Sequence, residues 1–113
     1  MIFTKTGHIQ QIINGTKTQT RRPSARYAVN KIYTIQPGKG KKGITEGKIK
    51  ILLKWKETSW YLDPLSRISS QDAKAEGGYT SDDYEHLYST MYPNWAIRWT
   101  YAFKFIPTSP RNG

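Results

Sequence analysis

The sequence predicts a single small α+β domain, a mixed β-barrel to which two or three short α-helices are added. Strand-like alternation occurs near both ends and in the middle of the chain, and short segments with helical spacing and capping residues lie between. The length of 113 residues suits one hydrophobic core, for which four Trp, eight Tyr and three Phe supply large side chains. We expect the domain to span residues 1–107, followed by a loose tail at 108–113.

The first fifteen residues predict a strand and then a short helix. Residues 1–5 predict a short strand, in which Ile2 and Thr4 alternate against Phe3. Thr6 stands where an N-cap residue is expected, and Gly15 suits the left-handed residue that ends a helix. Between them, three side chains fall on one helical face: Ile9, Ile12 and Ile13.

Two further strands are expected in the basic region that follows. Residues 31–37 alternate as a short strand, and a flexible basic loop comes after it. Residues 46–57 predict a longer strand with one apolar face and one lysine face. The apolar face consists of Ile49, Ile51, Leu53 and Trp55, and the lysine face of Lys48, Lys50, Lys54 and Lys56. The lysines either follow a phosphate backbone or keep a solvated sheet soluble.

The second half of the chain predicts two helices and a final strand. Ser69 or Ser70 caps a short helical turn that a glycine pair ends. Thr80 or Ser81 begins a second helix, whose apolar stripe is expected in the core: Tyr84, Leu87, Tyr88 and Met91. Residues 96–107 then alternate as a strand with an inward face made of Ile97, Trp99, Tyr101, Phe103 and Phe105.

The net charge of +10 is concentrated in the first half of the chain. Residues 1–60 carry ten lysines and three arginines against two glutamates, whereas residues 61–113 carry five basic and six acidic side chains. A concentrated positive field favours polyanions, so we expect RNA or another single-stranded nucleic acid as partner; a surface charged for solubility is the alternative. The expected contacts are Arg21, Arg22, Arg26, Lys39, Lys41, Lys42, Lys48, Lys50, Lys54 and Lys56.

Several classes of protein are not expected from this sequence. There is no cysteine, and the two histidines lie far apart, so we expect neither a disulfide nor a bound metal ion, and we expect no cofactor. No long apolar run is present, which predicts a cytoplasmic protein that does not bind membranes. The sequence predicts no particular oligomeric state.

The order of features resembles the ASCH domain family, which belongs to the wider group of PUA-like β-barrels. The segments that carry the resemblance are "INGTKTQTRR", "DAKAEGG", "SDDY", "MYPNW" and "AIRWTYAFKF", and together they cover nearly the whole chain. The pattern G-x-K-T-x-T-x-R with a later A-E-G is specific for the family but not for one activity. Members include RNA-binding modules, a ribonuclease and small bacterial enzymes that hydrolyse the amide of N4-acetylcytidine.

The resemblance implies three candidate catalytic residues. In the amidohydrolases a lysine and a threonine three positions later act with a glutamate before the second helix; here these are Lys17, Thr20 and Glu76. The threonine could supply a nucleophilic hydroxyl and the glutamate could shuttle protons. The lysine could either accept the threonine proton or stay charged and hold an oxyanion. On a regular strand residues 17 and 20 point to opposite faces, so they converge only through a turn or a bulge.

Three functions follow as expectations. The first is an RNA- or single-strand-binding domain with a basic cleft and a nucleoside-sized pocket. The second is an N4-acetylcytidine-type amidohydrolase that takes a nucleoside, and the third is a metal-independent ribonuclease. Tyr27, Trp60 and Tyr61 lie in predicted loops, where an aromatic ring can stack on a base, although such rings are more often in the core.

Overall fold

The computed structural model describes residues 1–59 and 62–108, and it confirms the predicted α+β fold class. In these residues four strands form one antiparallel sheet in the order β1-β4-β3-β2, accompanied by three short α-helices. The elements in chain order are α1 His8–Asn14, β1 Gln19–Arg22, β2 Ile32–Thr34, β3 Gly47–Thr58, a 3-10 turn Pro64–Ser66, α2 Ser70–Ala75, α3 Ser81–Met91 and β4 Ile97–Pro107. None of the described helices combines the length and the apolar character that crossing a lipid bilayer requires.

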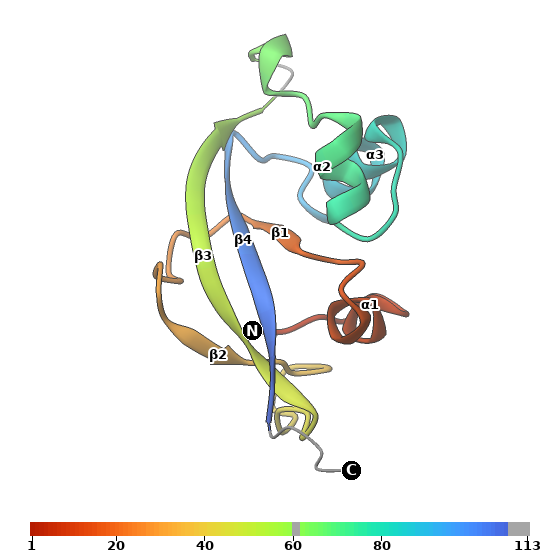
Figure 1. Cartoon of the computed structure of the whole chain (residues 1–113). Helices are drawn as coiled ribbons and strands as arrows, with labels where there is room; N and C mark the ends of the chain where they lie inside the picture. The colour runs from red at the N-terminus through yellow and green to blue at the C-terminus, as the bar shows by residue number, and fades with distance from the viewer. Residues whose placement is uncertain (60–61, 109–113) are drawn as a thin grey trace.

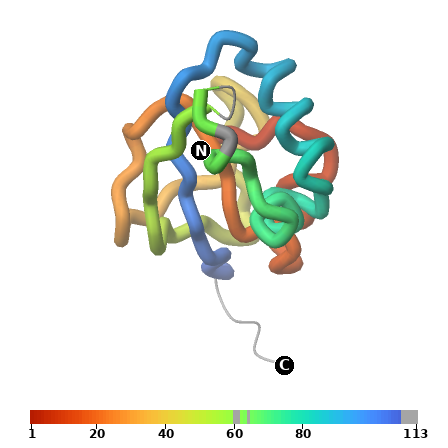
Figure 2. The backbone as a smooth tube through the Cα atoms, turned by 90° about the horizontal axis from the view of Figure 1, so that it is seen from above, coloured from red at the N-terminus to blue at the C-terminus, as the bar shows by residue number. Residues whose placement is uncertain are grey.

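The three helices lie on the side of the molecule where β1 forms the edge of the sheet. Figure 1 shows the long strands β3 and β4 side by side, with all three helices on the side from which the chain enters β1. The view from above shows the same separation, with the strands on one side and the helices on the other (Figure 2). The polar stretch over residues 15–24 therefore runs from the helical side into the sheet.

The capping predictions for the second half of the chain are confirmed. Ser69 caps α2 by accepting a hydrogen bond from the Asp72 amide, and Thr80 caps α3 by accepting one from the Asp83 amide. The glycine pair ends α2 with positive φ angles of 143° and 85°.

The start of the chain differs from the prediction. It forms no strand, only an isolated parallel bridge between Ile2 and Gln36, because the chain turns into α1 directly afterwards. Gly7 rather than Thr6 takes the N-cap position, with a φ of 84° that favours glycine. Gly15 ends the helix at a φ of 86°, as predicted.

The expected tail is held at its first residue. The amide of Thr108 donates to the Glu46 carbonyl oxygen at 3.0 Å, and its hydroxyl donates to the Thr45 carbonyl oxygen at 2.6 Å. Thr108 is therefore not loose, and residues 109–113 lie outside the described residues. Trp60 and Tyr61, considered for base stacking, also lie outside them.

A β-bulge in β3 interrupts the predicted alternation. The pairing moves from Ile51 opposite Phe103 to Leu53 opposite Ala102, which leaves Leu52 as an extra residue. From this point on, side chains appear on the face opposite to the one expected. Leu53, predicted to be in the core, is 61% exposed as a result.

The bulge also divides the predicted lysine face. Residues that pair across antiparallel strands share a face of the sheet. The four lysines therefore separate into two pairs: Lys48 and Lys50 lie on the outer face, whereas Lys54 and Lys56 lie on the face of Tyr101 and Trp99. Trp55 leaves the face of Ile49 and Ile51 together with Leu53.

The described residues pack into two apolar clusters rather than the one core expected from the length. The first cluster contains Met1, Phe3, Ile12, Ile35, Ile49, Ile51, Tyr101 and Phe103. The second contains Ile68, Ala73, Tyr84 and Tyr88, so part of the predicted α3 stripe is indeed core. Buried polar side chains contact both clusters: the Lys17 Nζ atom lies 6.0 Å from the Phe3 ring centroid, and the Arg21 Cζ atom 5.8 Å from that of Tyr84. A polar layer thus separates the two clusters.

Candidate active site

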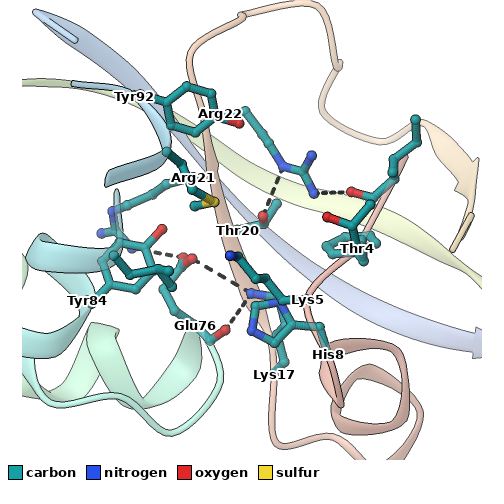
Figure 3. A pocket seen from close by; sticks show the side chains of 14 residues that line it. Thr4, Lys5, His8, Lys17, Thr20, Arg21, Arg22, Glu76, Tyr84 and Tyr92 are labelled. Carbon is teal, nitrogen blue, oxygen red and sulfur yellow. Dashed lines mark hydrogen bonds and ion pairs between the residues drawn. The ribbon is translucent and has the colours of Figure 1, made fainter. Parts of the chain in front are cut away.

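A cleft of about 80 Å³ lies in this polar layer, between the start of the chain, β1 and α3. Figure 3 shows that side chains from all three regions point into it. Lys17, Thr20 and Glu76 all line the cleft, so the fold brings the three candidate catalytic residues together. The cleft is smaller than the roughly 300 to 1,000 Å³ of most ligand pockets. It can therefore enclose part of a nucleoside, not the whole nucleoside that was expected.

The connection before β1 lets Lys17 and Thr20 face the same cleft. The Lys17 amide donates to the Gln11 carbonyl oxygen at 3.0 Å, and the Thr18 amide donates to the Ala75 carbonyl oxygen at 2.8 Å. The segment is thus held by α1 and α2, and strand pairing begins only with the next residue. Because Lys17 precedes the strand, the strict alternation that would separate it from Thr20 does not apply.

Lys17 is buried and has a lowered pKa. Its side chain is 2% exposed, and its Nζ atom donates to the Glu76 carbonyl oxygen and lies 3.7 Å from Oε1 of the same residue. Burial lowers the pKa of Lys17 to about 8, with Glu76 opposing and the positive charges of Arg22 and Arg21 assisting this effect. A lysine with this pKa can exchange a proton near neutral pH.

Glu76 is fixed at the end of α2, where it is the C-cap residue. Its Oε2 atom accepts a hydrogen bond from Arg21 Nη1 at 2.9 Å, while its Oε1 atom faces Lys17. The residue is 1% exposed. Two cations therefore compensate a carboxylate that water scarcely reaches.

Thr20 receives a cationic hydrogen-bond donor. Its hydroxyl oxygen, in a residue 4% exposed, accepts a hydrogen bond from Arg22 Nε at 3.2 Å. Arg22 is held in turn by the Ile2 carbonyl oxygen, to which its Nη2 atom donates at 2.5 Å, and it stacks over the Phe3 ring at 4.9 Å. A guanidinium donor in this position stabilises negative charge that develops on the threonine oxygen.

Arg21 occupies a different environment from Arg22. Its Nη1 atom donates to Glu76, and its Nε and Nη2 atoms donate to the two carboxylate oxygens of Glu57 at 3.1 and 2.9 Å. Burial alone would lower the pKa of Arg21, but the hydrogen bonds that it donates to Glu57 and the charge of Glu76 raise it above its ordinary value. With its charge compensated in the interior, Arg21 is not placed to make the nucleic-acid contact expected of it.

Glu57 is the centre of a buried charge network that the sequence did not reveal. Besides Arg21 it accepts hydrogen bonds from Arg98 Nε, the Thr100 hydroxyl and Trp55 Nε1, each at 3.0 Å. Burial alone would raise the pKa of Glu57, but Arg21 and then Arg98 lower it to about 2. Arg98 was expected on the outer face of the last strand, yet it is fully buried because side chains of α3 cover this part of the face. In the sequence, the only indication of this network was that Glu57 is a single carboxylate at the end of a lysine-rich strand.

His8 lines the cleft and was not among the predicted site residues. Its Nε2 atom lies 2.8 Å from the Tyr79 hydroxyl oxygen. Burial, followed by the charges of Lys17 and Arg22, lowers the pKa of His8 to about 4. His8 is therefore neutral at pH 7 and can exchange hydrogen bonds with a polar ligand but cannot attract a phosphate. In the sequence, the only indication that His8 belongs to the site was its position in the first turn of the helix that leads to Lys17.

The other predicted basic residues do not form one continuous surface. Arg26, Lys39, Lys41, Lys42, Lys48 and Lys56 are exposed, while Lys50 and Lys54 are half-buried. Register places Thr20 opposite Tyr101, which in turn faces Lys54, so Lys54 shares the sheet face of the cleft. Lys48 and Lys50 face away from it. Lys54 and Lys56, which lie on the cleft side, are thus better candidates for ligand contact than Lys48 and Lys50.

The α+β fold of this chain is similar to that of an ASCH domain. The ASCH domain from Lactobacillus crispatus JV V101 superposes with a TM-score of 0.61 at 13% identity, over 88% of this chain and 70% of that one. The hypothetical protein PH0355 gives 0.63 at 13% identity, over 93% and 96%. Protein EF3133 of Enterococcus faecalis V583, of the family DUF984, gives 0.62 at 14% identity.

These similarities show the fold, and no more than the fold at such low identity. The alignment with the Enterococcus protein covers 87% of this chain but 66% of that protein, so this chain spans just under two thirds of its length. No protein-family model matches the sequence. No curated protein matches it significantly either.

Proposed function

We propose that the cleft hydrolyses the amide of an N4-acylated cytosine. The observation that carries the proposal is the meeting, in one cleft, of Lys17 with a pKa of about 8, the Thr20 hydroxyl and the Glu76 carboxylate. A nucleophile, a base that is partly neutral at physiological pH and a fixed carboxylate are the groups that amide hydrolysis needs.

The reaction assigns one role to each group. Neutral Lys17 accepts the hydroxyl proton as the Thr20 oxygen attacks the acyl carbon, and the charged Arg22 stabilises the negative charge that develops on the threonine oxygen as its proton leaves. Breaking of the carbon–nitrogen bond returns the proton from Lys17 to the amino group of cytosine and leaves an acyl ester on Thr20. Water then hydrolyses the ester, which releases the carboxylic acid and restores the hydroxyl. Glu76 holds Lys17 in place and relays protons.

The size of the cleft decides how such a substrate lies. A volume of about 80 Å³ accommodates an acyl group and the amino edge of a pyrimidine, with the ribose outside. Neutral His8 at the cleft wall can exchange a hydrogen bond with the base. The cleft thus favours small acyl groups over large ones.

Replacement of Thr20 by valine tests the proposal. The variant keeps the shape of the side chain but removes the nucleophile, so release of cytidine from N4-acetylcytidine should fall by at least about 10²-fold. Thr18→Val is the matched control, because Thr18 is exposed on the same segment and should leave the rate unchanged. Chromatography of the products measures both. Absence of cytidine with the unmodified protein, or equal rates for the two variants, would remove the proposal.

RNA binding is the second candidate function. It is favoured by the charges around the cleft mouth, where Lys5 and Arg22 line the opening and the carboxylate of Glu76 is already paired inside. Single-stranded RNA should bind with an affinity that falls steeply with salt, by about 0.7 in log K per neutralised phosphate and per unit of log salt. Fluorescence anisotropy at several salt concentrations measures this slope. Binding that is absent or insensitive to salt would contradict it.

A further inference from the structure

A second, larger hollow adjoins the cleft. It has a volume of about 560 Å³ and is lined by residues of the chain start, the loop after β1, and β2 with the residues that follow it. Ile2 and Arg22 line both hollows, so the two lie directly on either side of these residues. Its volume falls in the range of ordinary ligand pockets. We call this hollow, lined among others by Arg22, Arg26, Tyr27 and Tyr33, the side groove.

The side groove presents a fixed aromatic wall. The Tyr27 ring packs edge to face against Tyr33, with centroids 5.0 Å apart, and against Tyr101, with centroids 5.4 Å apart. The Tyr33 hydroxyl accepts a hydrogen bond from the Ala28 amide, and the Tyr101 hydroxyl donates to the Ser24 carbonyl oxygen. Tyr27 and Tyr33 are both half-buried, so part of each ring remains open to a ligand. A nucleic-acid base can stack on the open face of such a ring.

Among the described residues, the charged side chains that line the side groove are Arg22 and Arg26, and none of its lining residues carries a carboxylate. Arg26 is exposed, and its guanidinium lies 5.2 Å from the centre of the Tyr27 ring. Within residues 1–59 and 62–108 it has no hydrogen-bond or ion-pair partner, and the Nη1 atom of Arg22 has none either. Two guanidinium groups with donors to spare, beside an aromatic wall, suit a phosphate attached to a planar base.

We propose that the side groove binds the nucleotide next to the one whose base enters the cleft. The neighbouring base stacks on the Tyr27 and Tyr33 wall, and the phosphate between the two nucleotides is bound by Arg22 and Arg26. Resting on the proposed function of the cleft, this assigns the substrate to a class: an acylated cytosine within a single strand, in preference to a free nucleoside. Arg22 couples the two sites because its Nε atom donates to Thr20 and the same residue lines the groove.

Binding of a fluorescein-labelled, unmodified pentaribonucleotide tests the side groove without any turnover. Arg26→Ala should weaken binding by about tenfold, the effect of losing one charge-assisted hydrogen bond. Lys104→Ala removes the same charge from an exposed site on the outer face of β4 and should change the affinity by less than about twofold. Equal losses in the two variants, or no loss in Arg26→Ala, would overturn the proposal.

A comparison of two substrates tests the preference for a strand. A pentaribonucleotide with a central N4-acetylcytidine should be hydrolysed with a higher kcat/KM than the free nucleoside, and Arg26→Ala should remove that advantage while leaving nucleoside hydrolysis intact. Equal kcat/KM values for both substrates argue against the groove as a substrate site. If neither substrate reacts, the hydrolytic function fails, whereas the pentaribonucleotide affinities still decide the groove. A pentadeoxynucleotide in the same binding assay shows whether the ribose hydroxyl contributes.

Discussion

Replacing Lys17 by methionine is expected to lower kcat/KM for N4-acetylcytidine by about 10²- to 10⁴-fold, the usual contribution of a positioned acid-base group. Methionine is close to lysine in length and suits the buried position next to Phe3, so the fold should persist. Circular dichroism provides the control for folding. A variant that folds and retains its activity would exclude Lys17 from the chemistry.

The pH profile distinguishes the two roles of Lys17. With a pKa of about 8, only about a tenth of the lysines are neutral at pH 7. If Lys17 is the base, the rate rises with pH and levels off above about 8; if it acts as a cation that holds an oxyanion, the rate falls over the same interval. Lys17→Arg separates the roles independently, because arginine keeps the charge but cannot serve as a base.

Replacing Glu57 by glutamine is expected to destabilise the fold by about 3 to 5 kcal/mol, the typical effect of removing one partner from a buried ion pair. The amide removes the negative charge that pairs with both Arg21 and Arg98. Its nitrogen is also a hydrogen-bond donor, and it would face guanidinium groups that can only donate. Urea denaturation measures the loss in the free energy of unfolding. Glu46→Gln is the matched control: Glu46 is exposed, and its replacement should cost less than about 0.5 kcal/mol. Equal effects of the two changes would show that the network contributes little.

The pKa of Glu57 also gives this prediction a pH dependence. Because folding lowers the pKa from 4.5 to about 2, the contribution of Glu57 to stability is complete above about pH 4.5 and is lost as the pH falls toward 2. Glu57→Gln should lack this part of the acid-induced decline. The difference in stability between the two proteins should therefore narrow between pH 4.5 and pH 2.5.

Local signals in the sequence predicted several parts of the fold. Hydroxyl side chains at Ser69 and Thr80 and the glycine after α1 determine where helices begin and end, since these preferences depend on the backbone nearby. The fold class could be predicted for the same reason, and so could the two longest strands. The pairing of Lys17 with Glu76 was predicted from the family resemblance, because the spacing of these two residues in the sequence gives no reason to expect them to meet.

Features that depend on contacts between distant segments could not be predicted. Arg21 and Arg22 are adjacent and chemically alike, yet one is buried against carboxylates and the other reaches the cleft. Their difference arises from the strand geometry, which turns successive side chains to opposite faces, and from the helices that cover one face. The division of the core into two clusters has the same origin, since it depends on which segments the helices cover.

The extra residue in β3 has a consequence for how this chain tolerates change in length. Because Leu52 is accommodated in the bulge, Glu57 lies on the sheet face that carries Arg98; if Leu52 took part in strict alternation instead, this carboxylate would lie on the opposite face, that of Tyr101 and Trp99. Deletion of Leu52 would join Ile51 directly to Leu53, whose partners Phe103 and Ala102 are already consecutive, so the six side chains from Leu53 to Thr58 should keep their faces and Arg21 its main partner. The bulge therefore lets β3 carry one additional residue without changing which charges meet behind the cleft.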